Sequence, residues 1–251
     1  MTRPYPHRPD VELAEDSYPE DRQFVEEAYA DLPRRSTLDN GAVSVTFDVL
    51  WDALAWGWLI ERPVPELRAL ITPAADLVRL ALGSPAAAEA KLYDTHVWVA
   101  TALLAGDDEV AARAGALGGA PAQDAEWFMA GLAALARGDD EAARECAARL
   151  RAAVVRPTTA PDVALALEHL GELADAVVDR DQGAFEAALV GRADAVARAH
   201  RTAAGRRSPT GVLDPVAIGM AEVATRRGLT VPLGVAVVPV ELLSVPARGA
   251  V

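Results

Sequence analysis

Apolar residues recur at helical spacing along most of this chain, and glycine and proline separate one such segment from the next. One clear stripe runs through the helix expected after Asp139 and consists of Ala143, Cys146, Ala147, Leu150, Ala153 and Val154. Residues spaced three and four apart lie on one face of a helix and bury that face against a neighbour. The pattern predicts a protein built from packed helices.

The segment from Val45 to Glu61 is the most apolar of the expected helices, with apolar residues around most of its circumference. Such a helix is expected to be buried on several sides. Its tryptophans, Trp51, Trp56 and Trp58, are open to two interpretations, a ligand cage or core packing. Core packing is the commoner role of aromatic residues in a helix, and it is the one we expect.

Prolines and glycines, which end helices, divide the rest of the chain into segments. Residues 1–10 hold three prolines and predict a flexible N-terminal arm, whereas residues 11–251 are expected to form a single α-helical domain. Further helices are expected over 11–32 with Phe24, Ala28 and Leu32 on one side, over 66–82 with a kink or break near Thr72, over 162–178, over 183–201, and before Gly228. Prolines make a central strand improbable in the tail from Leu229 to Leu243, which is expected to be a short strand or an ordered extended segment across the bundle.

The middle of the chain repeats one device, a helix, a glycine, an acidic start and another helix. Gly106 and Gly138 lie 32 residues apart, and each can take the left-handed conformation that ends a helix. Asp107 and Asp139 follow them and can cap the next helix. The fold class predicted is therefore all-α, an array of antiparallel α-hairpins with tetratricopeptide-like stacking, although the consensus aromatic and proline positions of that repeat are missing.

Charge and composition narrow the classes of function. The formal net charge of −13 argues against a nucleic-acid partner. It suits a basic protein partner, but many cytosolic proteins are acidic without one, and both interpretations stay open. The single cysteine, Cys146, excludes an intramolecular disulfide and a cysteine-rich zinc site, and it is expected to be an inert buried thiol. No apolar run is long enough to span a membrane and the start lacks the apolar region of a secretory signal, so a cytoplasmic protein is expected.

Residue patterns that carry catalysis are missing from the sequence. The four histidines, His7, His96, His169 and His200, are scattered and form no metal-binding pair, and no nucleophile or phosphate-binding motif occurs. We therefore predict no catalytic residue, no cofactor and no metal, and a protein that is not an enzyme.

Two groups of charged residues are candidates for contact with a partner protein. The acidic group lies at two helix starts, where capping already explains it, and it can also form one negative rim; it consists of Asp107, Asp108, Glu109, Asp139, Asp140 and Glu141. The basic group consists of His200, Arg201, Arg206 and Arg207. For the basic group three roles stay open: binding a carboxylate-rich surface, pairing with the acidic N-terminal helix, or stabilising a helix C-terminus.

The C-terminal quarter carries an ordered series of short motifs. A phenylalanine helix runs from Phe185 to His200, a loop with Arg206, Arg207 and Gly211 follows, and a small-residue helix ends at Gly228–Leu229 before a tail with Pro239 and Leu242–Leu243. In this order the motifs resemble the immunity protein 49 family of bacterial polymorphic toxin systems. Thr202 and Ala203 replace the aromatic residues usual in that family, the tail lacks its acidic residues, and the N-terminal third carries no resemblance.

The resemblance implies a mostly helical, non-enzymatic protein that binds a cognate toxin and neutralises it by stoichiometric occlusion. Because the family offers no catalytic residues, none is carried over to this chain. The alternative is an α-hairpin scaffold or regulatory module that binds a protein without any toxin partner. A pocket that gathers His96, His200 and several carboxylates around a metal would instead favour an enzyme.

Overall fold

The computed structural model describes residues 5, 7–35, 40–90, 92–117, 119–121, 123, 126–157, 159 and 161–244, without the side chains of Asn40, Glu89, Tyr93 and Asp162. Every regular element in these residues is a helix, so the predicted all-α class is confirmed. None of the helices in the described ranges is long and apolar enough to cross a membrane. The tetratricopeptide-like stacking of the α-hairpins stays a prediction.

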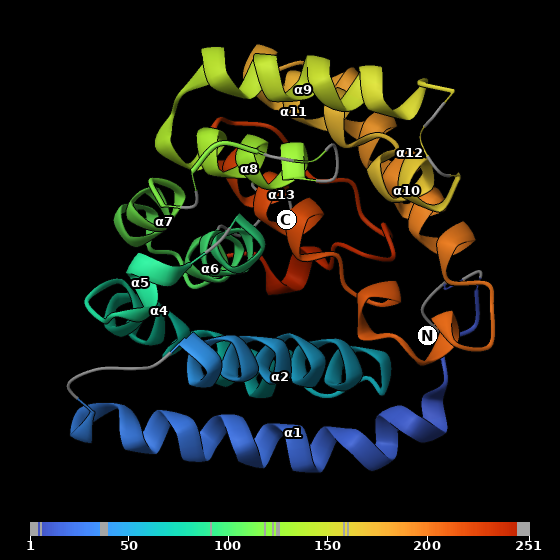
Figure 1. Ribbon diagram of the computed structural model, residues 1–251. Helices are drawn as coiled ribbons and strands as arrows, with labels where there is room; N and C mark the ends of the chain where they lie inside the picture. The colour runs from blue at the N-terminus through green and yellow to red at the C-terminus, as the bar shows by residue number, and fades with distance from the viewer. Residues whose placement is uncertain are drawn as a thin grey trace.

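Helices α1 (Val11–Asp31) and α2 (Asn40–Leu59) pack side by side and form a layer along one side of the molecule, at the bottom of Figure 1. The two helices are held to α3 by a close approach at Gly57, where an added Cβ atom would lie 2.6 Å from atoms of Tyr18 and Leu67. The Tyr18 hydroxyl also donates a hydrogen bond of 2.7 Å to Glu66. The tryptophans of α2 are buried in the core, as predicted.

Three short helices follow α2, namely α3 (Val64–Ile71), α4 (Ala74–Leu82) and α5 (Ala86–Glu89). The helix expected over 66–82 is thus broken, at Thr72 and Pro73. Proline lacks the N–H that would continue the hydrogen-bond series, which explains a break at this position.

Two helical hairpins come next, and consecutive helices of both are in contact. Their bounds are α6 Leu92–Leu104, α7 Asp108–Gly115, α8 Trp127–Arg137 and α9 Asp140–Val154. Gly106 and Gly138 have φ values of 82° and 73°, the left-handed conformation predicted for the hairpin turns. The Cys146 stripe of α9 is buried, and burial raises the pKa of that thiol to about 11.

The helix expected over 162–178 is wrong at its centre, because it divides into α10 (Pro161–Leu167) and α11 (Leu170–Asp179). His169 between them has φ of 65°, and its ring lies over Gly191 of α12 (Gln182–Ala199), where a Cβ atom would come within 2.7 Å of the imidazole. The contact between the ring and α12 is tertiary, which is why the local sequence pattern does not reveal this break.

Helix α13 (Pro215–Arg226) occupies the centre of the molecule. It contacts α6, α8 and α11, so it fills the inner side of the curve that the hairpins describe (Figure 1). Nine consecutive residues of α13 are buried, from Val216 to Ala224. The hairpins therefore enclose a helix and leave no empty concave face along α13.

The tail after Gly228 is irregular except for the short 3₁₀ helix η5 (Val240–Leu242), so the strand alternative is not observed in the described residues. It packs across the bundle: the Arg68 side chain donates to the carbonyl oxygen of Glu241 at 3.1 Å. Glu222, which is 0% exposed, accepts hydrogen bonds from the backbone N–H and the hydroxyl of Ser244. Polar contacts of this kind fix the tail to α13.

Candidate functional site

The predicted acidic group divides between paired and unpaired side chains. At the start of α7, the Asp107 side chain caps the helix by accepting from the N–H of Val110 and also pairs with Arg79. Asp108 lies 2.5 Å from the guanidinium of Arg226. Two of the three acids at this start are therefore neutralised within the protein.

The start of α9 is similar. Asp139 caps the helix through the N–H of Ala142, and Asp140 lies 2.7 Å from Arg227. Since Arg226 and Arg227 are neighbours at the end of α13, the two helix starts share one end of the molecule, as the rim interpretation requires. Asp139, Glu109 and Glu141 are exposed and make no ion pair with the described residues. Half of the six acids of the predicted negative rim are thus compensated by arginine.

The basic group belongs to the segment after α12, which includes the 3₁₀ turns η3 (Gly205–Arg207) and η4 (Pro209–Gly211). The Arg207 guanidinium lies 3.7 Å from Asp10, and the carbonyl oxygen of Arg206 accepts the Asp10 N–H at 2.9 Å. Of the three roles left open for this group, Arg207 thus shows pairing with the N-terminal helix. Arg201 is exposed.

Residues 5 and 7–10 of the expected N-terminal arm lie against the body; residues 1–4 and 6 are outside the described part. The Tyr5 hydroxyl donates to the carbonyl oxygen of Val212, and His7 is 4% exposed. The ring of His7 lies 6.0 Å from that of His200, and burial, then the charge of His200, lowers the pKa of His7 to about 4. At these residues the chain is packed, which the proline content did not reveal.

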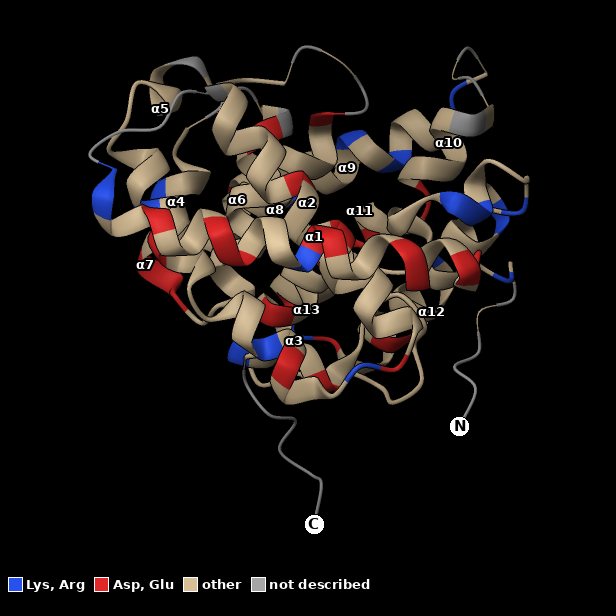
Figure 2. Ribbon diagram, turned by 90° about the horizontal axis from the view of Figure 1, so that it is seen from below, with Lys and Arg blue, Asp and Glu red and all other residues tan. Residues whose placement is uncertain are grey.

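The exposed side of α1 is rich in acidic residues. This helix holds eight acidic residues and one arginine, Arg22, out of a formal net charge of −13 for the chain. Figure 2, viewed from the α1 side, shows acidic residues along its length. In the first half of α1, residues 11–20, the acidic residues are exposed and make no ion pair with the described part of the chain; they are Glu12, Glu15, Asp16 and Glu20, which we call the acidic face.

An apolar groove of about 510 Å³ lies between α1 and α2, next to the acidic face. Phe24, one helical turn after Glu20, is 42% exposed at this groove, and Val45 on α2 is 50% exposed. Ala28 and Leu32 line the same groove, so the three residues predicted to share one side of α1 do so, and Leu32 also packs against the core. Exposed large apolar side chains gathered beside charged ones are typical of an interaction surface.

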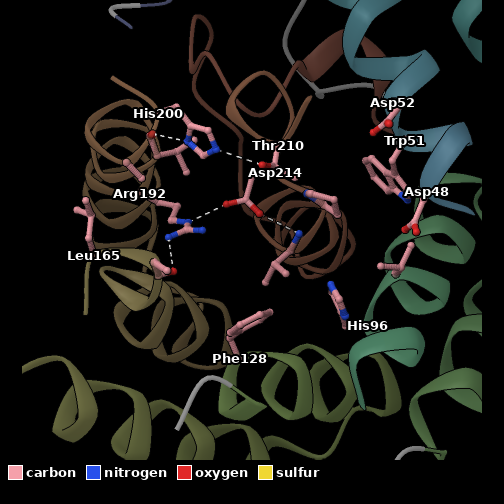
Figure 3. Close-up of a pocket in the computed structure, with 16 residues that line it drawn as sticks. Asp48, Trp51, Asp52, His96, Phe128, Leu165, Arg192, His200, Thr210 and Asp214 are labelled. Atoms are coloured by element: carbon pink, nitrogen blue, oxygen red, sulfur yellow. Dashed lines mark hydrogen bonds and ion pairs between the residues drawn. The ribbon is translucent and has the colours of Figure 1, made fainter. Parts of the chain in front are cut away.

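A pocket of about 330 Å³ lies between α2, α6, α8, α10, α12 and the start of α13. On one side, shown in Figure 3, the Nε atom of Arg192 donates to Asp214 at 2.7 Å and its Nη1 donates to the carbonyl oxygen of Ala166 at 2.7 Å. Asp214 is 5% exposed and also caps α13 by accepting from the N–H groups of Val216 and Ala217. This side of the pocket is rigid and its charges are balanced.

The opposite side of the pocket is formed by α2, which directs Asp48 and Asp52 toward it (Figure 3). The pKa of Asp52 is raised to about 7, chiefly by burial and then by the like charges of Asp21 and Asp48. Burial and Asp94 also raise the pKa of Asp48. Neither carboxylate makes a hydrogen bond or an ion pair with the described residues. This side therefore carries negative charge without a counter-ion.

His96 and His200 both line the pocket, as do three carboxylates, so part of the arrangement that would favour an enzyme is present. The structure does not support a metal site in this pocket. Among the described residues, no group of three histidine, cysteine or carboxylate side chains lies close enough together to hold an ion. His200 is engaged otherwise. Its Nδ1 lies 2.8 Å from the Val196 carbonyl oxygen and its Nε2 lies 3.1 Å from the Thr210 hydroxyl. A carbonyl oxygen only accepts, so Nδ1 carries the proton.

Sequence reasoning missed the residues of this pocket other than the histidines. One signal was present: Asp48 and Asp52 are four residues apart in the most apolar helix, so they share a face on which burial is expected. No comparable signal exists for Arg192 and Asp214, because their pairing depends on how α12 meets the start of α13.

Comparison of the chain with protein-family models, with curated proteins and with solved structures finds no match. The resemblance to the immunity protein 49 family thus stays a prediction from the sequence motifs.

Proposed function

We propose that this protein is an immunity protein that binds a cognate basic toxin through α1 and neutralises it by stoichiometric occlusion. The observation that carries the proposal is the acidic face of α1 beside the exposed Phe24 and the apolar groove. A basic partner would be attracted by the four carboxylates, and an apolar side chain of that partner would enter the groove. We propose no catalytic role for the protein.

Each part of this surface has a separate physical task. Complementary charge accelerates the encounter of two proteins, and this acceleration weakens as salt screens the charges. Apolar burial around an aromatic anchor slows dissociation. Because the acidic face and Phe24 lie on one helix, a single partner can engage both at once.

The position of α13 favours this proposal over the scaffold alternative. Helical repeat proteins bind partners on an extended concave surface. Here α13 is packed against the inner helices α6, α8 and α11, so a partner has no access to that side along α13. The outer surface of α1 is the better candidate.

The test is co-expression of this protein with the toxic protein encoded by the neighbouring gene, followed by measurement of binding between the purified proteins. Rescue of growth and a one-to-one complex would support the proposal. Failure to rescue growth together with failure to bind would contradict it. Binding of that protein without any protection would favour the scaffold alternative.

Two double variants test whether the partner binds at the acidic face of α1. The double variant Asp16→Lys/Glu20→Lys should lower the association rate constant about tenfold at low salt, and high salt should reduce the difference. Glu109→Lys/Glu141→Lys changes the net charge equally at the predicted rim and serves as the matched control. Equal effects of the two double variants would show that only the overall charge of the protein matters.

The apolar contribution has its own control. Phe24→Ala should raise the dissociation rate constant tenfold or more, on the order of a binding hot spot. Leu233→Ala removes an apolar side chain that is 83% exposed in the C-terminal tail and should leave the dissociation rate constant unchanged.

A further inference from the structure

The pocket between α2 and α12 has an unequal charge balance. Arg192 is its one arginine, and that guanidinium is satisfied by Asp214 and by the carbonyl oxygen of Ala166. Asp48 and Asp52 on the opposite side have no cationic partner among the described residues. When both carboxylates are ionised, the pocket therefore has a net negative charge that the protein itself does not compensate.

The other walls combine aromatic and aliphatic side chains with polar ones, among them His96, His200 and Thr210. The indole N–H of Trp51 donates to the Thr101 hydroxyl at 3.0 Å, which leaves the ring as a rigid surface of the pocket. Phe128 packs edge-on against the His96 ring with 5.8 Å between the ring centres. A ligand that enters this space meets the rings of Trp51 and Phe128 beside the polar residues, and the carboxylate oxygens of Asp48 and Asp52 at one end.

The carboxylate pair has a cost for folding. Asp48 is exposed and Asp52 is half-buried. Their like charges, four residues apart, oppose each other, and replacement of one of them would relieve the repulsion. Groups whose ionisation is perturbed in this way gather at binding and catalytic sites. A bound cation would remove the repulsion, and the volume of about 330 Å³ is within the range of small-ligand pockets.

The geometry points to a binding site for a small organic monocation, an ammonium or guanidinium group on an apolar stem, with its charge at Asp48 and Asp52 and its stem along Trp51 and Phe128. A metal ion is a poorer occupant, because no group of three metal-binding side chains forms among the described residues. This site is separate from the acidic face of α1, and it functions without any partner protein.

The experiment is isothermal titration of the full chain at pH 8 with three probes of similar shape, phenethylammonium, phenethyl alcohol and phenylacetate. Phenethylammonium should bind with a Kd of about 1 mM or lower, the alcohol at least about tenfold more weakly, and the anion not measurably. Equal binding of the alcohol and the ammonium ion would overturn the proposal. Two further cations with apolar stems, n-hexylammonium and n-butylguanidinium, are titrated in the same way, and failure of all three cations to bind would also overturn the proposal.

Two variants and a control connect the binding to the pocket. Asp52→Asn should weaken phenethylammonium binding about tenfold or more, and Asp48→Asn should weaken it in the same direction. Asp194→Asn removes an equal charge from an exposed position on α12 outside the pocket and should leave the Kd unchanged. An unchanged Kd in both pocket variants would overturn the proposal. The circular dichroism spectrum of each variant verifies its fold.

Discussion

The acidic residues at the starts of α7 and α9 and those of α2 are in opposite electrostatic situations. Asp107, Asp108 and Asp140 each face an arginine, so their charges are compensated inside the protein. Asp48 and Asp52 face a pocket and have no cationic partner among the described residues. The first group is conspicuous in the sequence and the second is not.

The difference shows that clustering of acids along a chain does not measure the charge available to a partner. A run of acids at a helix start is stabilised locally by the cap and the helix dipole. Whether charge remains depends on which arginines the fold brings near. Arg226 lies 118 residues after Asp108, and Arg227 lies 87 residues after Asp140. Available charge is therefore a property of the tertiary structure.

Among the residues that compensate the acids at the starts of α7 and α9, Arg226 is the one whose replacement should destabilise the protein most. Its guanidinium contacts Asp108 and lies 2.5 Å from Glu222, a carboxylate that is 0% exposed. Arg226→Met should lower the free energy of unfolding by about 3–5 kcal/mol, because it leaves the Glu222 carboxylate buried without its cation. Urea denaturation of both proteins measures the difference in the free energy of unfolding.

The double variant Arg226→Met/Glu222→Leu separates this cause from loss of packing. It removes the buried charge together with its partner and should recover much of the lost stability. If the double variant is as unstable as Arg226→Met, the explanation by an unpaired carboxylate is wrong.

Removal of an uncompensated charge, that of Asp52, should raise the free energy of unfolding instead of lowering it. The pKa of Asp52 is about 7, so the folded protein holds this proton more tightly than the unfolded chain does. Stability from this group is therefore present below pH 4 and is lost as the pH rises toward 7. Asp52→Asn should raise the free energy of unfolding by about 2 kcal/mol at pH 8, less than the full shift allows because the side chain is partly solvated.

The same comparison at pH 4 provides the control, since Asp52 is then protonated in the folded protein and the gain should nearly vanish. Denaturation curves of both proteins at the two pH values measure the difference. A gain of equal size at pH 4 and pH 8 would show that relief of charge is not its cause.

A cap at a helix start is expected to matter less. Asp139 accepts the N–H of Ala142 at 3.1 Å and is exposed, so Asp139→Ala should lower the free energy of unfolding by about 1 kcal/mol. Asp139→Asn keeps a capping oxygen and should restore most of the loss in the same denaturation measurement. Equal losses in both variants would assign the effect to charge instead of capping.

The smallest effect is expected at the acids of the same starts that have no ion pair. Glu109→Gln and Glu141→Gln should each change the free energy of unfolding by less than about 0.5 kcal/mol, because both side chains are exposed. A loss near that of Asp139→Ala would show that the helix dipole contributes more here than the cap does.

Much of the fold was predictable because its causes are local. Gly106 and Gly138 take the left-handed turns expected of them, and Asp107, Asp139 and Asp181 cap the helices that follow. Errors arose where a distant contact decided the result. His169 lies where the expected helix divides, and its ring packs on Gly191 of another helix.

By itself the sequence determined the all-α class, the hairpin turns, the caps and the excess of negative charge, since each follows from the spacing or the type of neighbouring residues. Only the tertiary structure decided which charges are compensated, that α13 fills the inner side of the hairpins, and that Asp48, Asp52, Arg192 and Asp214 share one pocket. Those outcomes depend on contacts between residues far apart in the chain, and electrostatic energies depend on distance and burial in space.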